Sequence, residues 1–208
     1  MVARAHEQIV AYDVPFDAFV TGFEGHYEWI AGEVYQMSPV SDQHDEISKY
    51  LIGLLSAYLE LRPIGRLKVA PFSMRLPEVN TAREPDLHVV LDASTTTIKP
   101  GYTDGPADLA VEIVSPESTT RDRGVKYEEY ELSGVREYWI IDPLRREALF
   151  YVLGEDGRYT PGDVQAGQYA CHVLPGLLLT VSLLWSPPYP GPIATGEAVR
   201  TMLQDDSE

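Results

Sequence analysis

The sequence predicts an α/β (α+β) protein whose core follows the order helix, three strands, helix, strand. Apolar residues recur at steps of three and four over residues 47–59, which is the pattern of a helix with one buried face. Residues 109–114 are apolar enough for a strand that is covered on both faces. A segment that ends at a glycine, Gly134, then leads into a further apolar strand over residues 137–142. This alternation favours one layered domain.

The first elements expected along the chain are a hairpin and a long helix. The hairpin strands cover residues 27–30 and 33–37 and flank Ala31-Gly32, because glycine permits the positive φ of a tight turn. Asp42 is the expected cap of the helix, which Pro63 and Gly65 end. Its predicted buried stripe consists of Ile47, Leu51, Leu54, Leu55, Tyr58 and Leu59.

The remaining core elements follow in the second half of the chain. Three strands are expected over residues 66–76, 85–92 and 108–115, and Thr119 or Thr120 caps a helix that runs to about Ser133. The strand over residues 137–142 closes at Pro143, and later strands turn at Asp156-Gly157 and Pro175-Gly176. We expect one domain over residues 10–185, followed by a Pro-rich segment and acidic tail over residues 186–208.

Composition limits the classes of function. The 208 residues include 16 Lys and Arg against 32 Asp and Glu, so the net charge is −16 and gives no general attraction to nucleic acid or anionic membranes. The single cysteine, Cys171, excludes a disulfide framework or a cysteine-based zinc site within the chain. No stretch resembles a secretory signal or reaches the ~20 apolar residues of a membrane span. We therefore expect a soluble, cytoplasmic protein.

Carboxylates at strand ends are the strongest chemical signal. The common phosphate-loop, dinucleotide-binding, zinc-protease and nucleophile-elbow motifs are missing from the sequence. Asp86 follows Pro85 at the start of one strand, and Glu112 lies inside an apolar strand, where an ionised carboxylate is costly unless it is paired, protonated or metal-bound. Two such carboxylates can hold Mg²⁺. Among the four lysines, Lys126 alone lies on the helix that follows Glu112.

Several spaced motifs together carry a family resemblance over about residues 20–185. They are Gly32-Glu33, Pro85-Asp86, Val111-Glu112-Ile113-Val114-Ser115-Pro116, Asp122-Arg123, Lys126-Tyr127, Tyr130, Gly134-Val135, Glu137-Tyr138-Trp139, Asp142-Pro143 and Pro175-Gly176-Leu177. In this order they resemble the Uma-two family of restriction-endonuclease-like proteins. The resemblance implies the PD-(D/E)XK nuclease fold, in which two acids and a lysine bind a divalent metal and hydrolyse a phosphodiester bond.

The resemblance assigns expected roles residue by residue. Asp86 and Glu112 match the two acids, so they are expected to bind Mg²⁺ or Mn²⁺ together with the carbonyl of Ile113. The sequence departs from the superfamily pattern two residues after Glu112, where Val114 stands in the lysine position. The family resemblance places the lysine at Lys126, which would orient the attacking water. The expected activity is a metal-dependent DNA endonuclease.

Other residues carry weaker expectations. His44 and Glu33, and less so Glu46, are candidates for a third metal ligand or a proton carrier. Arg121 and Arg123 could contact phosphate or pair with nearby acids, for which Glu117, Glu128 and Glu129 are candidates. Tyr127 and Tyr130 are expected to pack and Trp139 to lie in the core. The structural alternatives are a turn acid for Asp86, a pair with a helix arginine for Glu112, and a surface pair with Asp122 for Lys126.

Two other classes of function remain open. The displaced lysine and the charge of −16 are also compatible with a non-cleaving interaction module that keeps the nuclease fold. The two acids are also compatible with a metal-dependent hydrolase of smaller phosphate esters. Residues 121–146 hold six basic and six acidic side chains and are neutral in an otherwise acidic chain. If DNA is the substrate, the sequence therefore predicts weak, salt-sensitive binding. A homodimer is the expected assembly, since symmetric pairing is common among oligomers.

Overall fold

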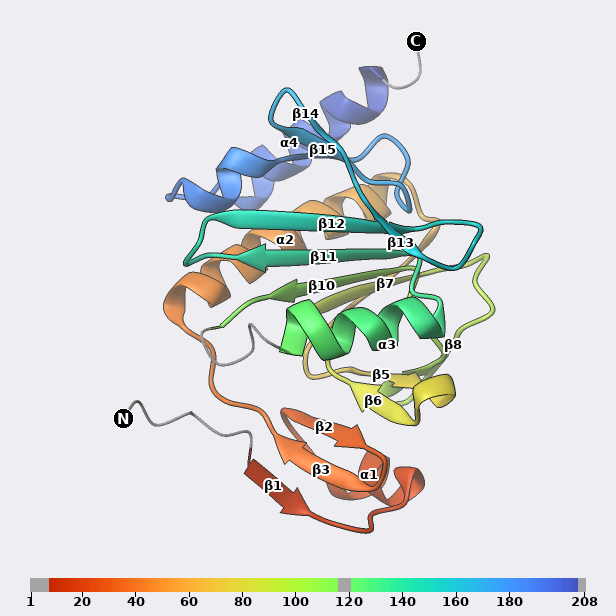
Figure 1. The fold of residues 1–208 in the computed structure, drawn as a ribbon. Coiled ribbons are helices and arrows are strands. Elements are labelled where there is room, and N and C mark those ends of the chain that lie inside the picture. Colours follow the sequence, from red (N-terminus) through yellow and green to blue (C-terminus); the bar gives the residue numbers. More distant parts are fainter. Residues whose placement is uncertain (1–7, 116–120, 206–208) are drawn as a thin grey trace.

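A six-stranded sheet forms the centre of the protein (Figure 1). The structure is a computed structural model that describes residues 8–115 and 121–205. The strands lie in the order β13-β12-β11-β10-β7-β4. Their bounds are β4 (Gly65–Val69), β7 (Leu87–Leu91), β10 (Leu109–Ile113), β11 (Glu137–Asp142), β12 (Glu147–Leu153) and β13 (Tyr159–Pro161).

Helices cover both faces of this sheet. On one face, α2 (Asp42–Leu61) packs its apolar stripe against alternate strand residues such as Val89 and Val111. On the other face, α3 (Lys126–Ser133) places Tyr130 against Ala110 and Ile140. Successive side chains of a strand point to opposite faces, and both faces of β7 and β10 are buried and, apart from His88 and Glu112, mostly apolar.

The predicted order of the core is confirmed. In the chain, α2 is followed by β4, β7 and β10, then by α3 and β11, and the four strands belong to one sheet. Strands β10 and β11 are parallel, with Glu112 opposite Ile140, and α3 lies in the connection between them. Gly134 ends α3 at φ 87°, as a left-handed residue that glycine adopts without steric cost.

Helix α2 begins one residue earlier than the sequence suggests. Its N-cap is Ser41, whose hydroxyl oxygen accepts a hydrogen bond from the backbone N–H of His44 at 3.2 Å, and Asp42 is the first helical residue. Serine caps a helix as well as aspartate does, so the two adjacent residues compete for this position. The expected caps Thr119 and Thr120 lie outside the described residues, which resume with a π-helix, η2 (Arg121–Val125).

A second, seven-stranded sheet contains the N-terminal hairpin. The strand order is β1-β3-β2-β6-β5-β9-β8. The strands are β1 (Gln8–Ala11), β2 (Tyr27–Ile30), β3 (Glu33–Gln36), β5 (Ser73–Leu76), β6 (Thr81–Arg83), β8 (Thr97–Lys99) and β9 (Tyr102–Asp104). Helix α1 (Phe16–Gly22) packs on it, and η1 (Pro77–Val79) connects β5 to β6. The hairpin turn has positive φ at Ala31 (50°) and Gly32 (99°), as expected for a tight two-residue turn.

The prediction of one strand over residues 66–76 is wrong. The chain leaves the central sheet after β4 and enters the second sheet at β5, and Pro71 lies in the break. The alternation that marks both halves as strands does not show where one strand ends and the next begins. The chain crosses back between β6 and β7, through Glu84, Pro85 and Asp86. These two crossings place the start of β7 at the junction of the sheets.

The C-terminal part adds a small sheet and a helix. Strands β14 (Val164–Gln165), β15 (Gln168–Ala170) and β16 (Leu178–Thr180) precede η3 (Val181–Trp185). The predicted turns hold Gly157 at φ 73° and Gly176 at φ 81°. Where the sequence suggests a Pro-rich segment and acidic tail, the structure has α4 (Pro192–Asp205), which lies against α2 and buries Val199 (Figure 1). In the described part of the chain, no helix is both long and apolar enough to cross a membrane.

Candidate active site

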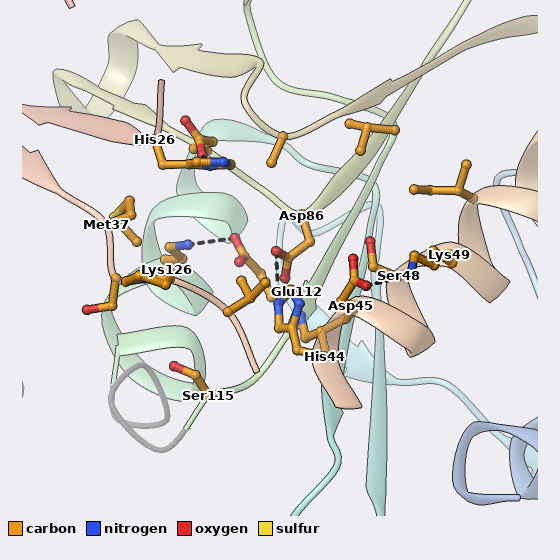
Figure 2. Close-up of a pocket in the computed structure, with 18 residues that line it drawn as sticks. His26, Met37, His44, Asp45, Ser48, Lys49, Asp86, Glu112, Ser115 and Lys126 are labelled. Atoms are coloured by element: carbon orange, nitrogen blue, oxygen red, sulfur yellow. Dashed lines mark hydrogen bonds and ion pairs between the residues drawn. The ribbon is translucent and has the colours of Figure 1, made fainter. Parts of the chain in front are cut away.

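A cavity of about 320 Å³ opens at the junction of the two sheets (Figure 2). The start of β7, the end of β10, the first turns of α2 and the first residue of α3 all contribute to its wall. Four of the predicted site residues line it, namely His44, Asp86, Glu112 and Lys126, and so does Ile113. The fold therefore brings together residues that are up to 82 positions apart in the chain (126 − 44).

Asp86 is held at both carboxylate oxygens. Its Oδ1 atom lies 3.1 Å from Nε2 of His44, which α2 presents from its first turn. Its Oδ2 atom accepts a hydrogen bond of 2.6 Å from the backbone N–H of Ile113. The pairing of Leu87 with Val111 puts Asp86 next to Glu112 in the antiparallel register of β7 and β10. Asp86 is thus a fixed carboxylate beside a second one.

Glu112 is bound to the lysine that the sequence indicates. Its Oε1 atom lies 2.8 Å from Nζ of Lys126 and accepts a second hydrogen bond, also of 2.8 Å, from the hydroxyl of Tyr130. Burial, together with the charge of Glu112, raises the pKa of Tyr130 well above its usual value, so the hydroxyl keeps its proton and acts as the donor. Val114 is buried in the apolar cluster beneath α3, which leaves the cationic role to Lys126.

A carboxylate that the sequence does not indicate also contacts Lys126. Glu28, in β2, has no exposed surface, and its Oε1 atom lies 3.0 Å from Nζ of Lys126. Burial alone would raise the pKa of Glu28, but the charges of Lys126 and Arg83 outweigh it and lower the pKa to about 2. Lys126 therefore lies between two carboxylates from different sheets.

Arg83 extends this network away from the cavity. Its Nη1 atom donates to Oε2 of Glu28 at 2.7 Å, while Nε and Nη2 bind the two oxygens of Glu129 at 2.6 and 2.7 Å. The second contact is a bidentate pair, the geometry in which guanidinium binds carboxylate most specifically. Arg83 is 1% exposed, so it fixes Glu28 from behind within the protein interior.

A histidine–glutamate pair lines the opposite wall of the cavity. His26 is 58% exposed, and its Nδ1 atom lies 2.6 Å from Oε1 of Glu84, whose side chain is 4% exposed. The Oε2 atom of Glu84 accepts from the backbone N–H of Tyr27 at 3.3 Å. Burial raises the pKa of Glu84 to about 7, although the hydrogen bond from His26 opposes that shift.

The donor set fits a hard divalent cation. Asp86 and Glu112 line one cavity and supply carboxylate oxygens, and Mg²⁺ characteristically takes one or two protein carboxylates and keeps several waters. Among residues 8–115 and 121–205, no three His, Cys, Asp or Glu side chains form a ready metal cluster. A cation here would therefore depend on the two carboxylates, a backbone oxygen and water.

Other predicted residues lie away from the cavity. Glu33 accepts a 2.5 Å hydrogen bond from the hydroxyl of Tyr35 and is not part of the wall, so the structure does not bring it to the site. Glu46 pairs with Lys49 at 2.9 Å on the exposed side of α2. Tyr127 packs against Tyr151 and Tyr159, and Trp139 lies in the core, both as expected.

The basic residues expected near phosphate are only partly described. Arg123 pairs with Asp142 at 3.0 Å and with Glu147 at 2.6 Å, neither of which is among the acids suggested for it. The side chain of Arg121 lies outside the described residues, as do Glu117 and the side chain of Asp122. Glu112 pairs with Lys126, which is buried and does not lie on a solvated face.

Sequence reasoning missed Glu28, Arg83 and Glu84. The pairing of Trp29 with Ala82 sets Glu28 beside Arg83 in neighbouring strands, and this contact spans 55 positions. A signal was available in the predicted hairpin, where Glu28 stands between the aromatic residues Tyr27 and Trp29. An acid in that setting is either on the exposed face of the strand or paired, and the sequence alone does not decide between them.

Comparisons with known proteins agree with this arrangement. The model of the Uma2 (Uma-two) family, described as "Putative restriction endonuclease", matches residues 16–182. One similar solved structure is described as "a putative nuclease belonging to DUF820" from Anabaena variabilis ATCC 29413. It has a TM-score of 0.64 and 17% identity, over 78% of this chain and 91% of the other. The comparison with curated proteins gives no match. At this level of identity the solved structure supports the restriction-endonuclease-like fold alone.

Proposed function

The chain belongs to the Uma2 family, and we propose on that basis that it is a divalent-metal-dependent endonuclease that hydrolyses phosphodiester bonds in DNA. One observation carries the proposal: Asp86, Glu112 and Lys126 line a single cavity, and the ammonium of Lys126 lies 2.8 Å from Glu112. A pair of carboxylates with an adjacent lysine is a set suited to phosphodiester hydrolysis.

Asp86, Glu112 and the carbonyl of Ile113 would hold Mg²⁺ or Mn²⁺. A bound cation of this kind supplies a more acidic water and offsets negative charge on the phosphate. The 3.1 Å contact with Nε2 of His44 and the hydrogen bond from the Ile113 N–H keep the Asp86 carboxylate in a fixed orientation. The Tyr130 hydroxyl does the same for Glu112. A preset geometry reduces the reorganisation needed when a ligand binds.

Lys126 is proposed to orient the attacking water and to stabilise the charge that develops on the phosphate. Its ammonium carries three N–H donors, so it can contact a carboxylate and a reacting oxygen at the same time. It is held on the first residue of α3, next to the cavity, and 1% of its surface is exposed. A buried cation acts more strongly on a nearby charge than one in water.

Binding of DNA is expected to be local and salt-sensitive. The chain carries a net charge of −16, and Lys49, at the cavity wall, is paired with Asp45 at 2.6 Å. The field of this excess negative charge opposes a polyanion, so DNA affinity should depend on contacts within the cavity. Cleavage of both strands would require two such sites, which a homodimer would supply.

Supercoiled plasmid tests this proposal. Nicked or linear product is expected with Mg²⁺ or Mn²⁺ and not with EDTA, and Asp86→Asn and Glu112→Gln should remove the activity. Glu46→Gln is the matched control, because Glu46 is an acid at the start of α2 that does not line the cavity. Cleavage that survives Asp86→Asn or Glu112→Gln at the wild-type rate would overturn the assignment.

A second candidate function is a non-cleaving interaction module with the same fold. The observation in its favour is that Lys126 already lies between Glu112 and Glu28. Its ammonium and the Glu112 carboxylate thus bind each other, whereas a nuclease must use both groups on its metal and substrate. Mn²⁺ binding without cleavage of plasmid, single-stranded DNA or RNA would favour this module. Turnover of mononucleotides without polymer cleavage would instead favour hydrolysis of small phosphate esters.

A further inference from the structure

We propose that Glu28 is a positioning residue for metal binding: it retains the ammonium of Lys126 when a divalent cation takes the Glu112 carboxylate. This inference rests on the proposed function, since it assumes that Glu112 is a metal ligand. It assigns a role in the site to the N-terminal hairpin, which contributes no residue to the expected acid–acid–lysine set.

A divalent cation and Lys126 compete for Glu112. The Nζ atom of Lys126 lies 2.8 Å from Oε1 of Glu112, which also accepts from Tyr130, so this oxygen is engaged before any cation arrives. A cation at Glu112 repels the ammonium and weakens that pair. Because Lys126 is 1% exposed, water cannot readily replace the lost carboxylate, and the loss of an anionic partner from a buried ammonium is strongly unfavourable.

Glu28 is placed to resolve this competition. Its Oε1 atom lies 3.0 Å from the same ammonium, on the side that belongs to the second sheet. Its Oε2 atom is held by Arg83 at 2.7 Å, and Oε1 also accepts from the backbone N–H of Glu84 at 3.3 Å. The carboxylate is therefore fixed independently of Lys126. It gives the ammonium a partner with which to stay when Glu112 turns to a cation.

The charges of the network fit this role. Two cationic side chains, Lys126 and Arg83, contact three carboxylates, Glu112, Glu28 and Glu129, so the network has one carboxylate in excess of its cations. Without Glu28, the Lys126 ammonium would depend more on Glu112, and a cation would have to disrupt that stronger pairing to bind. The affinity of the site for a divalent cation should then fall, as it does when outer-shell partners of metal ligands are removed.

The experiment measures Mn²⁺ affinity of the purified full chain, without nucleic acid, by titration calorimetry. Glu28→Gln is expected to weaken Mn²⁺ binding by about 10–100-fold. Glu129→Gln is the matched control, because it removes a carboxylate of the same network whose two oxygens both bind Arg83. It should change the affinity by less than about threefold.

A double-mutant cycle then separates positioning from the bare charge of Glu28. In the Lys126→Met background, Glu28→Gln should again weaken Mn²⁺ binding, but the fold-loss of affinity should be smaller than in the wild-type background by at least about fivefold. The reason is that no ammonium remains to be retained. An equal or larger loss in that background would overturn the proposal, since Glu28 would then act directly on the cation. An unchanged affinity of Glu28→Gln in the wild-type background would also overturn it.

Failure of this inference can be told apart from failure of the proposed function. If Mn²⁺ binds, Asp86→Asn abolishes the binding and the cycle shows no coupling, then the inference alone is wrong. If wild-type protein binds no Mn²⁺, both are wrong. Circular dichroism verifies folding of each variant. If Glu28→Gln does not fold, Glu28→Asp replaces it, and an affinity equal to wild type would count against the inference, because the shortened side chain draws the carboxylate away from Lys126.

Discussion

The ammonium of Lys126 lies 2.8 Å from the carboxylate of Glu112, although 14 positions separate the two residues. Glu112 stands on β10, and Lys126 is the first residue of α3, the helix that connects β10 to the parallel strand β11. The connection packs α3 against the face of the sheet, so the first residue of α3 lies over β10, the strand that precedes it. A lysine on this helix can therefore contact the same carboxylate that a lysine on the strand would otherwise contact.

Replacement of Lys126 should be costly for stability. Lys126→Met leaves Glu28 and Glu112 buried without their shared cation, so the free energy of unfolding should fall by about 3–5 kcal/mol. Urea denaturation measures this change. Lys49→Met is the control, because the side chain of Lys49 is 62% exposed and its ion pairs lie at the surface. This substitution should change the free energy of unfolding by less than about 1 kcal/mol. Equal effects of the two substitutions would contradict the buried position of Lys126.

Glu84 should make stability depend on pH near neutrality. Its pKa is raised to about 7 from 4.5, mainly by burial, so the folded protein binds a proton that the unfolded chain releases. The stability that this proton contributes is fully present below pH 4.5 and is lost as the pH rises through 7. The loss amounts to about 3 kcal/mol at ~1.4 kcal/mol per pKa unit.

The measurement is urea denaturation of wild type and Glu84→Gln between pH 5 and pH 8. The free energy of unfolding of wild type should fall relative to that of Glu84→Gln as the pH rises, because glutamine does not titrate. Glu46→Gln, at an exposed acid, should follow the wild-type curve. A constant difference between wild type and Glu84→Gln would show that the Glu84 carboxyl has an ordinary pKa.

His44 should affect metal affinity more than stability. Its Nε2 atom lies 3.1 Å from Oδ1 of Asp86, and the helix cap is provided by Ser41, so His44→Ala removes the support of Asp86 and leaves α2 capped. Mn²⁺ affinity should fall by about 10–100-fold. His172→Ala, at an exposed histidine outside the cavity wall, is the control and should have no effect. An unchanged Mn²⁺ affinity in His44→Ala would show that His44 has no role in metal binding.

Helix α4 should contribute to the stability of the domain. Val199 is fully buried in the cluster that α2 shares with the central sheet, so Val199→Ala should cost about 1–3 kcal/mol. Ile193, on the same helix, is 80% exposed, and Ile193→Ala should change the free energy of unfolding by less than about 0.5 kcal/mol. Thermal and urea unfolding compare the two variants, and a negligible cost for Val199→Ala would mean that α4 is detached in solution.

Local patterns account for the part of the fold that the sequence predicts. The apolar stripe from Ile47 to Tyr58 and the apolar strand around Glu112 are each defined by residues close together in the sequence, and the structure contains both. Glu112 is identifiable because it is an acid inside an apolar strand, and Asp86 and Lys126 are identifiable because they match motifs in the family resemblance. The structure places all three on one cavity.

Long-range pairing accounts for what the sequence does not reveal. The contact of Glu28 with Arg83 depends on β2 pairing with β6, and no local periodicity encodes the pairing of strands that are 55 positions apart. The division of residues 66–76 depends on which sheet each half joins after Pro71. Helix α4 follows a Pro-rich stretch, which is typical of the end of a domain. Its apolar face is narrow, so the sequence gives little sign of a buried helix there.

The most direct test of the site is a crystal structure of the protein with Mn²⁺, collected at a wavelength where manganese scatters anomalously. The account predicts one anomalous peak in the cavity, within coordination distance of both Asp86 and Glu112, and an ammonium of Lys126 that has moved from Glu112 toward Glu28. A peak away from these two carboxylates, or no peak at saturating Mn²⁺, would contradict the assignment of this cavity as a metal-dependent active site.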